Sequence, residues 1–316
     1  MHINGNIMTG ELKKLQYGIL VWKMDGMGTI NVEIPKISTL KSNKRFDVRL
    51  QNGNRYYCSF DTSEEEFKVY LVLTSGKKLI RVNEIAQIFP LKKSFWLRTS
   101  GDFGLGGNYS KGSDLLTVNF STYISHRRQS AFYNFSWDTY YTFQNDSLNS
   151  IKSDARISWE RIRKSKLSYG AFFGMGQNSE LGTRMRLDLT TVGIYDFIFN
   201  SWTRFSAVAG ISAEQEYSYS DSEPMKYITG NFGLGWKVYK LTKPKVWIES
   251  DLQYLPYYNS DGRYRFNFNL NPKVGLIGNN LKIGFRTYFS YDSQPVSEDA
   301  NKNDWGANLE ISYSFH

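Results

Sequence analysis

The chain has 316 residues, a formal net charge of +9, 41% hydrophobic residues and a mean hydropathy of −0.47. It contains no run of eighteen apolar residues, which excludes transmembrane helices, and its single cysteine, Cys58, excludes an intrachain disulfide. No recognition helix, zinc motif or dense Lys/Arg block accompanies the basic charge, so we expect no nucleic-acid partner.

The first ninety residues contain a weak internal repeat with a constant offset of 48 residues. Asn4-Gly5 recurs as Asn52-Gly53, and Gly28 aligns with Gly76. Asn-Gly pairs favour tight hairpin turns because they accept positive φ angles, and each copy continues as short alternating strands. We therefore predict a duplicated small β unit, similar to the SH3 or Sm type, in a domain spanning residues 1–90.

The polar residues of this segment predict no catalytic or metal site. Asp47 and Arg49 alternate with apolar neighbours, so we interpret them as the water-facing side of a strand. The acidic run from Asp61 to Glu66 is typical of a solvated loop, and Cys58 is interpreted as a small buried residue. A proline followed by two lysines, at 90–93, marks the expected boundary with a second domain, residues 94–316.

From residue 95 onwards, polar and apolar residues alternate in segments long enough to cross a membrane as tilted strands. In Lys152–Glu160 the even positions are mostly charged and the odd positions mostly apolar or small, as on a strand between water and oil. We therefore predict an all-β chain that ends in a transmembrane antiparallel β-barrel of about 12 strands. The expected strands are 95–106, 114–125, 131–143, 151–162, 166–177, 183–197, 202–217, 226–239, 245–256, 263–275, 280–292 and 304–315.

The connections between these strands also alternate in character. One set is short and often basic, such as Arg163-Lys164-Ser165, and the other is more acidic and in places longer, such as 293–303. Outer-membrane barrels have short periplasmic turns and longer external loops, so we expect the bacterial outer membrane, with the N-terminal domain in the periplasm. The first residues do not form a signal peptide, and we expect the export signal to be missing from this sequence.

The alternation also predicts which side chains face the lumen and which face lipid. A slip of one residue would expose the whole charged set to lipid, so the register is strongly specified. The expected lipid-facing residues are Leu116, Val118, Phe120, Leu187, Leu189, Val246, Ile248, Leu252, Phe266, Phe268, Leu270, Ile283, Phe285, Leu309 and Ile311. The expected lumen-facing residues are Lys152, Asp154, Arg156, Glu160, Arg184, Arg186, Asp188, Glu249, Asp251, Gln253, Arg265, Asn267, Asn269, Lys282, Arg286, Asn308 and Glu310.

Several short motifs resemble the salt-induced outer-membrane protein family, a family of β-barrels of unknown function. They are Phe95-Trp96-Leu97, the glycines at 101 and 104, Gly106-Gly107-Asn108, and the closing Ser312-Tyr313-Ser314-Phe315. The resemblance covers residues 94–316, and Gly10-Glu11-Leu12 looks like the periplasmic extension of some members. It implies an outer-membrane location and a role in osmotic or envelope stress, and it supplies no catalytic residues.

Three hypotheses for function remain open at this point. The first is a non-enzymatic barrel whose charged lumen is plugged or forms a narrow pore, in contact with outer-membrane lipid and lipopolysaccharide. The second is a binding or anchoring protein whose N-terminal domain or external loops contact a periplasmic protein, peptidoglycan or another ligand. The third and least favoured is a hydrolase, because His126 beside Ser130 lacks an orienting carboxylate and Glu249 with Asp251 fits a polar lumen equally well. No cofactor or metal is expected.

Overall fold

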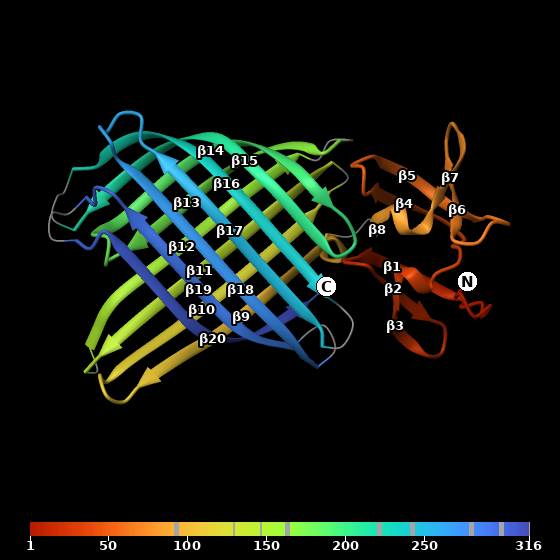
Figure 1. The fold of residues 1–316 in the computed structure, drawn as a ribbon, viewed down its shortest axis with the longest axis horizontal. Coiled ribbons are helices and arrows are strands. Elements are labelled where there is room, and N and C mark those ends of the chain that lie inside the picture. The colour runs from red at the N-terminus through yellow and green to blue at the C-terminus, as the bar shows by residue number, and fades with distance from the viewer. Residues whose placement is uncertain are drawn as a thin grey trace.

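The computed structural model describes residues 1–91, 95–128, 130–145, 147–161, 165–219, 223–240, 244–277, 281–296 and 300–315. These residues form two sheets, an eight-stranded sheet at the N-terminus and a closed barrel of twelve antiparallel strands (Figure 1). Within them, no helix is both long and apolar enough to cross a membrane. The all-β class and the twelve-strand barrel expected from the alternation are confirmed.

The N-terminal sheet contains the duplication that the sequence predicts. Its strand order is β3-β2-β1-β8-β4-β5-β6-β7, so the two copies join in one sheet instead of closing as two separate small barrels. β3 with the short helix η1 lies 48 residues before β7 with η2, and both Asn-Gly glycines have positive φ, 84° at Gly5 and 88° at Gly53. The elements are β1 Gly10–Gln16, β2 Ile19–Met24, β3 Gly28–Glu33, η1 Ile34–Lys36, β4 Ser42–Leu50, β5 Arg55–Thr62, β6 Lys68–Leu73, β7 Gly76–Arg81, η2 Val82–Glu84 and β8 Ile85–Pro90.

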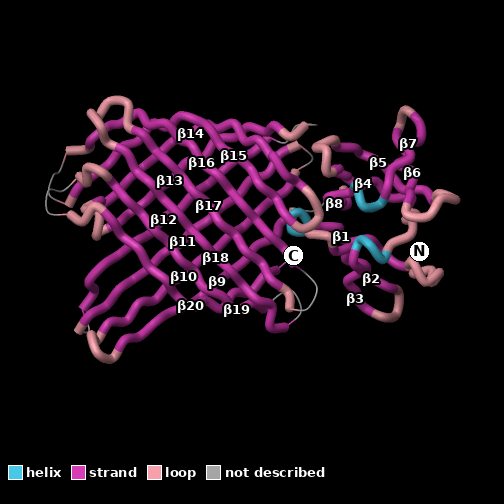
Figure 2. The backbone as a smooth tube through the Cα atoms, viewed as in Figure 1, coloured by secondary structure: helices cyan, strands magenta, loops and turns pink. Residues whose placement is uncertain are grey.

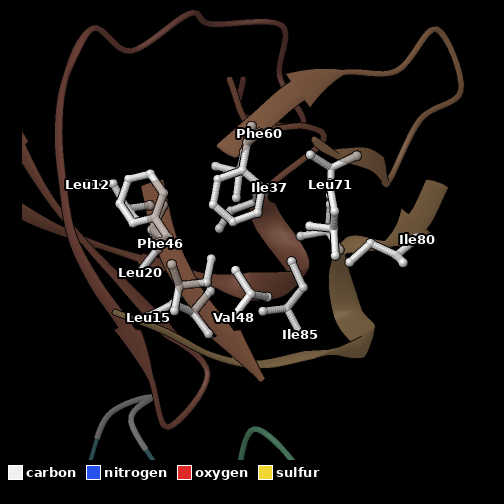
Figure 3. Packing of buried hydrophobic residues seen from close by; sticks show 14 of the residues in the cluster. Leu12, Leu15, Leu20, Ile37, Phe46, Val48, Phe60, Leu71, Ile80 and Ile85 are labelled. Atoms are coloured by element: carbon white, nitrogen blue, oxygen red, sulfur yellow. The ribbon is translucent and has the colours of Figure 1, made fainter. Parts of the chain in front are cut away.

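This domain has its own hydrophobic core, to which both copies contribute (Figure 3). Leu15 and Ile85 are fully buried there, and the rings of Phe46 and Phe60 pack 5.4 Å apart. Cys58 is also fully buried, and burial raises the pKa of its thiol to about 12. A thiol of that pKa is almost entirely protonated at neutral pH, so Cys58 is a packing residue and not a nucleophile.

The barrel strands are continuous and long (Figure 2). The first begins four residues later than expected, because Trp96–Arg98 form a 3₁₀ turn, η3, before it. His126 and Arg127 lie inside the second strand and not in the expected turn. The strands are β9 Thr99–Ser110, β10 Leu115–Arg127, β11 Ala131–Gln144, β12 Ser147–Arg161, β13 Leu167–Asn178, β14 Thr183–Phe199, β15 Thr203–Ser218, β16 Met225–Lys240, β17 Val246–Pro256, β18 Tyr264–Ile277, β19 Leu281–Asp292 and β20 Asn303–Phe315.

The outer surface of the barrel is apolar over its full circumference. Outward-facing side chains pair in register from strand to strand, as Phe173 does with Leu189 and Phe285 with Leu309. A barrel with an apolar outer surface and a charged interior is the reverse of a water-soluble barrel, which has a polar outer surface and an apolar core. It matches the alternation of transmembrane barrels. The most exposed members include Phe103, Leu105, Ile157, Phe173, Met175, Leu189, Ile211, Phe232, Trp236, Phe285, Leu309 and Ile311.

The N-terminal sheet lies at one open end of the barrel (Figure 1). We call this the near end. It carries the start of β9, the end of β20, and turns such as the one between β14 and β15. The opposite, far end carries the connections that follow β9, β11, β13, β15, β17 and β19.

Candidate functional site

The far end of the lumen is closed by buried ion pairs. Arg263, just before β18, and Arg265, within it, both bind Asp292 of β19, with N–O distances of 2.7 and 2.6 Å. Both also bind Glu216 of β15, Arg263 at 2.9 Å. Because β16 and β17 separate β15 from β18 in the wall, these bonds run through the lumen. We call these four residues the far-end network, and each of their side chains is at most 2% exposed.

Neighbouring hydroxyl groups stabilise the carboxylates of this region. Thr183 donates a hydrogen bond to Glu216 at 2.8 Å. Tyr257 and Thr229 donate to Glu214, at 2.9 and 3.1 Å, and Glu214 lies 3.9 Å from Arg265. Buried ion pairs are stable only when further hydrogen bonds offset the cost of removing the charges from water. The far-end network meets this condition on its carboxylate side.

Further side chains cross the middle of the lumen. Arg286 of β19 donates to Asp138 of β11 at 2.5 Å, and Lys152 of β12 donates to Ser290 of β19 at 2.7 Å. Asn178 of β13 donates to Asp304 of β20 at 2.8 Å. In each pair at least three strands separate the partners around the ring. Side chains therefore bridge the lumen at several levels between its middle and its far end.

The near half of the lumen holds a chamber of about 1470 Å³. Lumen-facing side chains of the barrel, such as Glu249 and Lys282, form its wall. The N-terminal sheet covers it, with Tyr17, Arg49 and Phe89 facing the cavity. None of the four residues of the far-end network lines this chamber, so the chamber and the network occupy different parts of the lumen.

Two charged clusters hold the N-terminal sheet on the near end. In the first, Asp47 of β4 accepts hydrogen bonds from Arg55 of its own domain and from Arg127 of the barrel, the latter at 2.6 Å. The Arg127 guanidinium also lies 3.9 Å from the ring centre of Phe89. Asp47 is 2% exposed. The interpretation of Asp47 as a water-facing residue is therefore wrong, because the face it lies on is covered by the barrel.

The second cluster centres on Asp196 of β14, which is 1% exposed. Arg49 of the N-terminal sheet donates to it at 2.8 Å, and Arg204 of β15 donates at 2.7 Å. Arg49 also lies 3.9 Å from the ring centre of Phe199. Like Asp47, Arg49 was expected to face water because it alternates with apolar neighbours. This interpretation is also wrong, because the barrel covers the face on which Arg49 lies. Beside these clusters, the rings of Tyr17 and Tyr239 stack with centroids 3.7 Å apart.

The docking of the two domains can be tested with a disulfide. A Cβ built on Gly18, in the turn before β2, would lie 3.4 Å from the Cβ of Ser201 on the barrel rim, close to the separation found in disulfides. We expect Gly18→Cys with Ser201→Cys to form an intramolecular disulfide, seen as a reduction-sensitive mobility shift, while buried Cys58 stays unreacted.

The matched control is Gly26→Cys with Ser201→Cys. Gly26 has the same type of backbone conformation, with φ of 78° against 76° at Gly18, but nothing lies within 4 Å of its Cβ position. It should not form the disulfide. Equal yields from both pairs would contradict the docked arrangement.

The pKa of Asp47 makes the docking sensitive to acid. Burial alone would raise this pKa, but the hydrogen bond from Arg55 and the charge of Arg127 lower it below its ordinary value. A group with a lowered pKa in the folded state stabilises the fold above its ordinary pKa, about 3.9 for Asp, and loses this contribution as the pH falls through the lowered value. We expect docking to be constant from neutral pH down to about pH 5 and to weaken below about pH 4.

Spin labels at Gly26→Cys and at the exposed Lys240→Cys would report this change as a broadened interdomain distance distribution. An Asp47→Asn variant should show weaker docking with less dependence on pH in this range. Broadening of the native distribution already between pH 7 and about pH 5 would argue against Asp47 as the group responsible.

Most of the residues predicted to face the lumen contact one another or other polar groups there. Arg184 differs: the pairing of β14 with β15 shifts between Thr183 and Met185, and the exposed guanidinium lies 5.9 Å from the ring centre of Tyr217. A bulge of this kind breaks the two-residue period on which the prediction depends. The contacts of the others are Lys152 with Ser290, Asp154 with Arg186, Arg156 with Phe172, Glu160 with Ser168, Asp188 with Thr190, Glu249 with Lys237, Asp251 with Asn269, Arg265 with Glu216, Lys282 with Ser314, and Arg286 with Asp138 and Glu310.

The residues considered for hydrolysis form no catalytic constellation among the described residues. His126 Nδ1 lies 3.0 Å from the hydroxyl of Thr99, and Phe95 stacks on its other side. Glu249 lies 3.3 Å from Lys237, and Asp251 accepts a hydrogen bond from Asn269 at 2.8 Å. Nucleophilic catalysis requires a base that is itself oriented by a third group, and no carboxylate contact of His126 is observed in the described part of the chain.

Comparison with known proteins yields only remote structural similarity. No family model matches the chain, and no curated protein matches it. Solved structures that align include a bacterial polysaccharide outer membrane secretin (7% identity, TM-score 0.38, 69% of this chain and 98% of that one) and the KdgM porin in complex with disordered oligogalacturonate (14%, 0.37, 69% and 99%). The translocator domain of the autotransporter NalP from Neisseria meningitidis also aligns (12%, 0.35, 69% and 88%). The likeness is too remote to assign a family, and the resemblance to the salt-induced family stays a prediction.

Proposed function

We propose that this protein is a non-enzymatic β-barrel of the bacterial outer membrane whose lumen is plugged. Support for the membrane comes from the apolar outer surface, since an Arg or Lys at mid-bilayer on that face would cost about 2–4 kcal/mol. Support for the plug comes from one observation above all, the buried far-end network that crosses the lumen from Glu216 to Arg265. In this proposal the N-terminal sheet lies in the periplasm and the plug lies toward the cell exterior. The apolar outer surface of the barrel contacts outer-membrane lipid and lipopolysaccharide.

The test is single-channel recording of the full chain in planar bilayers. We expect no conductance above leak, because side chains bridge the far half of the lumen. Insertion must be shown independently, by flotation with lipid vesicles and by a heat-dependent mobility shift of the folded barrel. A steady open-channel current from inserted protein would show that the lumen is a pore.

A binding or anchoring role for the N-terminal domain is the second candidate. Within the described residues, the terminal strands β3 and β7 of the sheet pair with β2 and β6 on one side, and no strand of the sheet pairs with their outer edges. Edge strands can pair with a strand of another protein, so a periplasmic protein is the partner this geometry favours over peptidoglycan. A pull-down with the full chain, compared with a variant carrying Pro at Lys78 in β7, would test it. Equal recovery of a partner by both chains would exclude pairing at that edge. A role in osmotic or envelope stress is implied only by the family resemblance.

A further inference from the structure

The chamber at the near end carries an excess of positive charge. The described residues that line it include eleven Lys or Arg and six Asp or Glu side chains. Two further carboxylates lie behind the wall: Asp196 pairs with Arg49 and Arg204, and Glu310 pairs with Lys273 and Arg286. When these two carboxylates are included, the chamber still has more positively than negatively charged side chains. Because low-dielectric walls concentrate the field of such a surface, the chamber attracts anions.

Some of the ion pairs on this wall can exchange partners at little cost. Lys237 and Glu249 lie 3.3 Å apart, and each side chain is 46% exposed. Lys282 lies 3.6 Å from Asp102; the Lys282 side chain is 13% exposed and that of Asp102 43%. Ion pairs that are open to water contribute little to stability, so an incoming anionic group can replace Glu249, and it can compete with the exposed Asp102 for Lys282. The buried pairs of the far-end network cannot exchange in this way.

The wall also offers aromatic surface beside these lysines. The Lys282 ammonium lies 4.7 Å from the ring centre of Trp247, and both residues line the chamber together with Tyr17 and Phe132. Binding pockets for small molecules commonly have volumes of about 300–1000 Å³, so a chamber of about 1470 Å³ accommodates a ligand of several units. Spaced cations beside aromatic surface suit a chain of repeated anionic groups more than a single ion.

We propose that the near-end chamber binds an oligoanion, a short linear solute that carries several phosphate or carboxylate groups. The cations of these two pairs, the exposed Lys237 and the more buried Lys282, contact its charged groups, and Trp247 lies against it. The ligand enters from the near side, because the plug closes the other end. This proposal goes beyond the assignment of a plugged barrel and does not depend on whether the barrel conducts ions.

The test is calorimetric titration of the full chain in neutral detergent, at an ionic strength of about 0.1 M or below. Inorganic tripolyphosphate and triglutamate distinguish the two anionic chemistries, and trialanine is the neutral probe. We expect at least one anionic probe to bind, with an affinity that falls steeply as salt is added, and trialanine not to bind. Binding should also change the fluorescence of Trp247. The contribution of Trp247 is the part of the tryptophan signal that a Trp247→Phe variant lacks.

Three variants assign the binding to the chamber. Lys237→Gln with Lys282→Gln should weaken it about tenfold or more, equivalent to about 1.4 kcal/mol. Lys240→Gln, an exposed lysine of the same strand outside the chamber, should leave it unchanged. Glu249→Gln should tighten it severalfold, a gain that a misfolded variant would not show.

Four outcomes would overturn the proposal. They are the absence of binding by both anionic probes, equal binding of trialanine, equal affinities in the double variant and in Lys240→Gln, or weaker binding in Glu249→Gln. The conductance experiment is separate, so a conducting barrel that binds tripolyphosphate would overturn the plug and retain the chamber site.

Discussion

Replacing Glu216 with Gln destabilises the barrel by about 3–5 kcal/mol, the usual cost of removing one partner from a buried ion pair. Glu216 accepts from both Arg263 and Arg265, and its side chain is fully buried. Without its charge, the two buried guanidinium groups keep Asp292 as their shared carboxylate, and among the described residues only Arg265 has a further one, Glu214, at 3.9 Å. Urea-induced unfolding in lipid vesicles, followed by tryptophan fluorescence, measures the change.

A second substitution separates loss of charge balance from loss of packing. Glu216→Gln combined with Arg263→Gln restores equal numbers of cations and carboxylates, so it should be more stable than Glu216→Gln alone. Asp261→Asn, at an exposed carboxylate of the same end, should change stability by less than about 0.5 kcal/mol. A Glu216→Gln barrel as stable as the native one would show that the network does not hold the far end.

Most of the barrel could be predicted from the sequence, because its strands obey a period of two and no other element interrupts them. Once Lys152–Glu160 is placed with its charges inward, pairing with the neighbours fixes the register of the next strand. The start of the first strand could not be placed, because Trp96 and Leu97 are as compatible with a strand as with the 3₁₀ turn they form.

The site was harder to predict, since alternation gives the face of a residue and not its partner. Three carboxylates near strand ends occupy positions that the two-residue alternation places on the lumen side: Glu214, Glu216 and Asp292. The sequence therefore indicated that they face the lumen. The contacts of Glu216 and Asp292 with Arg263, and of Glu214 with Arg265, depend on which strands face each other across the closed ring. Asp47 and Arg49 were misplaced for a related reason, because a polar face looks the same whether water or another domain covers it.

The two ends of the lumen are closed by different means. The far-end network crosses the lumen and joins Glu216, Arg265 and Asp292, which lie on barrel strands that hydrogen-bond along their length, to Arg263 just before β18. The near end is covered by a separate domain with its own core, so it can open without breaking any barrel strand. A ligand of the chamber would therefore gain access by movement of the N-terminal sheet, and the contacts that hold this sheet control entry.

Replacing Asp196 with Ala should release the N-terminal sheet from the barrel. The substitution leaves the buried Arg49 and the half-buried Arg204 without a carboxylate between them, a cost on the order of 3–5 kcal/mol for Arg49 while the domains stay docked. Undocking lets Arg49 return to water, so the cost falls mainly on the docked state. We expect a broadened distance distribution between spin labels at Gly26→Cys and Lys240→Cys, and a lower yield of the Gly18→Cys and Ser201→Cys disulfide.

Asp188→Ala is the matched control for this change. It removes the same side chain from the same strand at a position away from the N-terminal sheet, where Asp188 accepts a hydrogen bond from Thr190 at 3.2 Å. It should leave both the label distance and the disulfide yield unchanged. If Asp196→Ala behaves like Asp188→Ala, the stacking of Tyr17 on Tyr239 and the Asp47 cluster hold the sheet by themselves, and access to the chamber does not depend on Asp196.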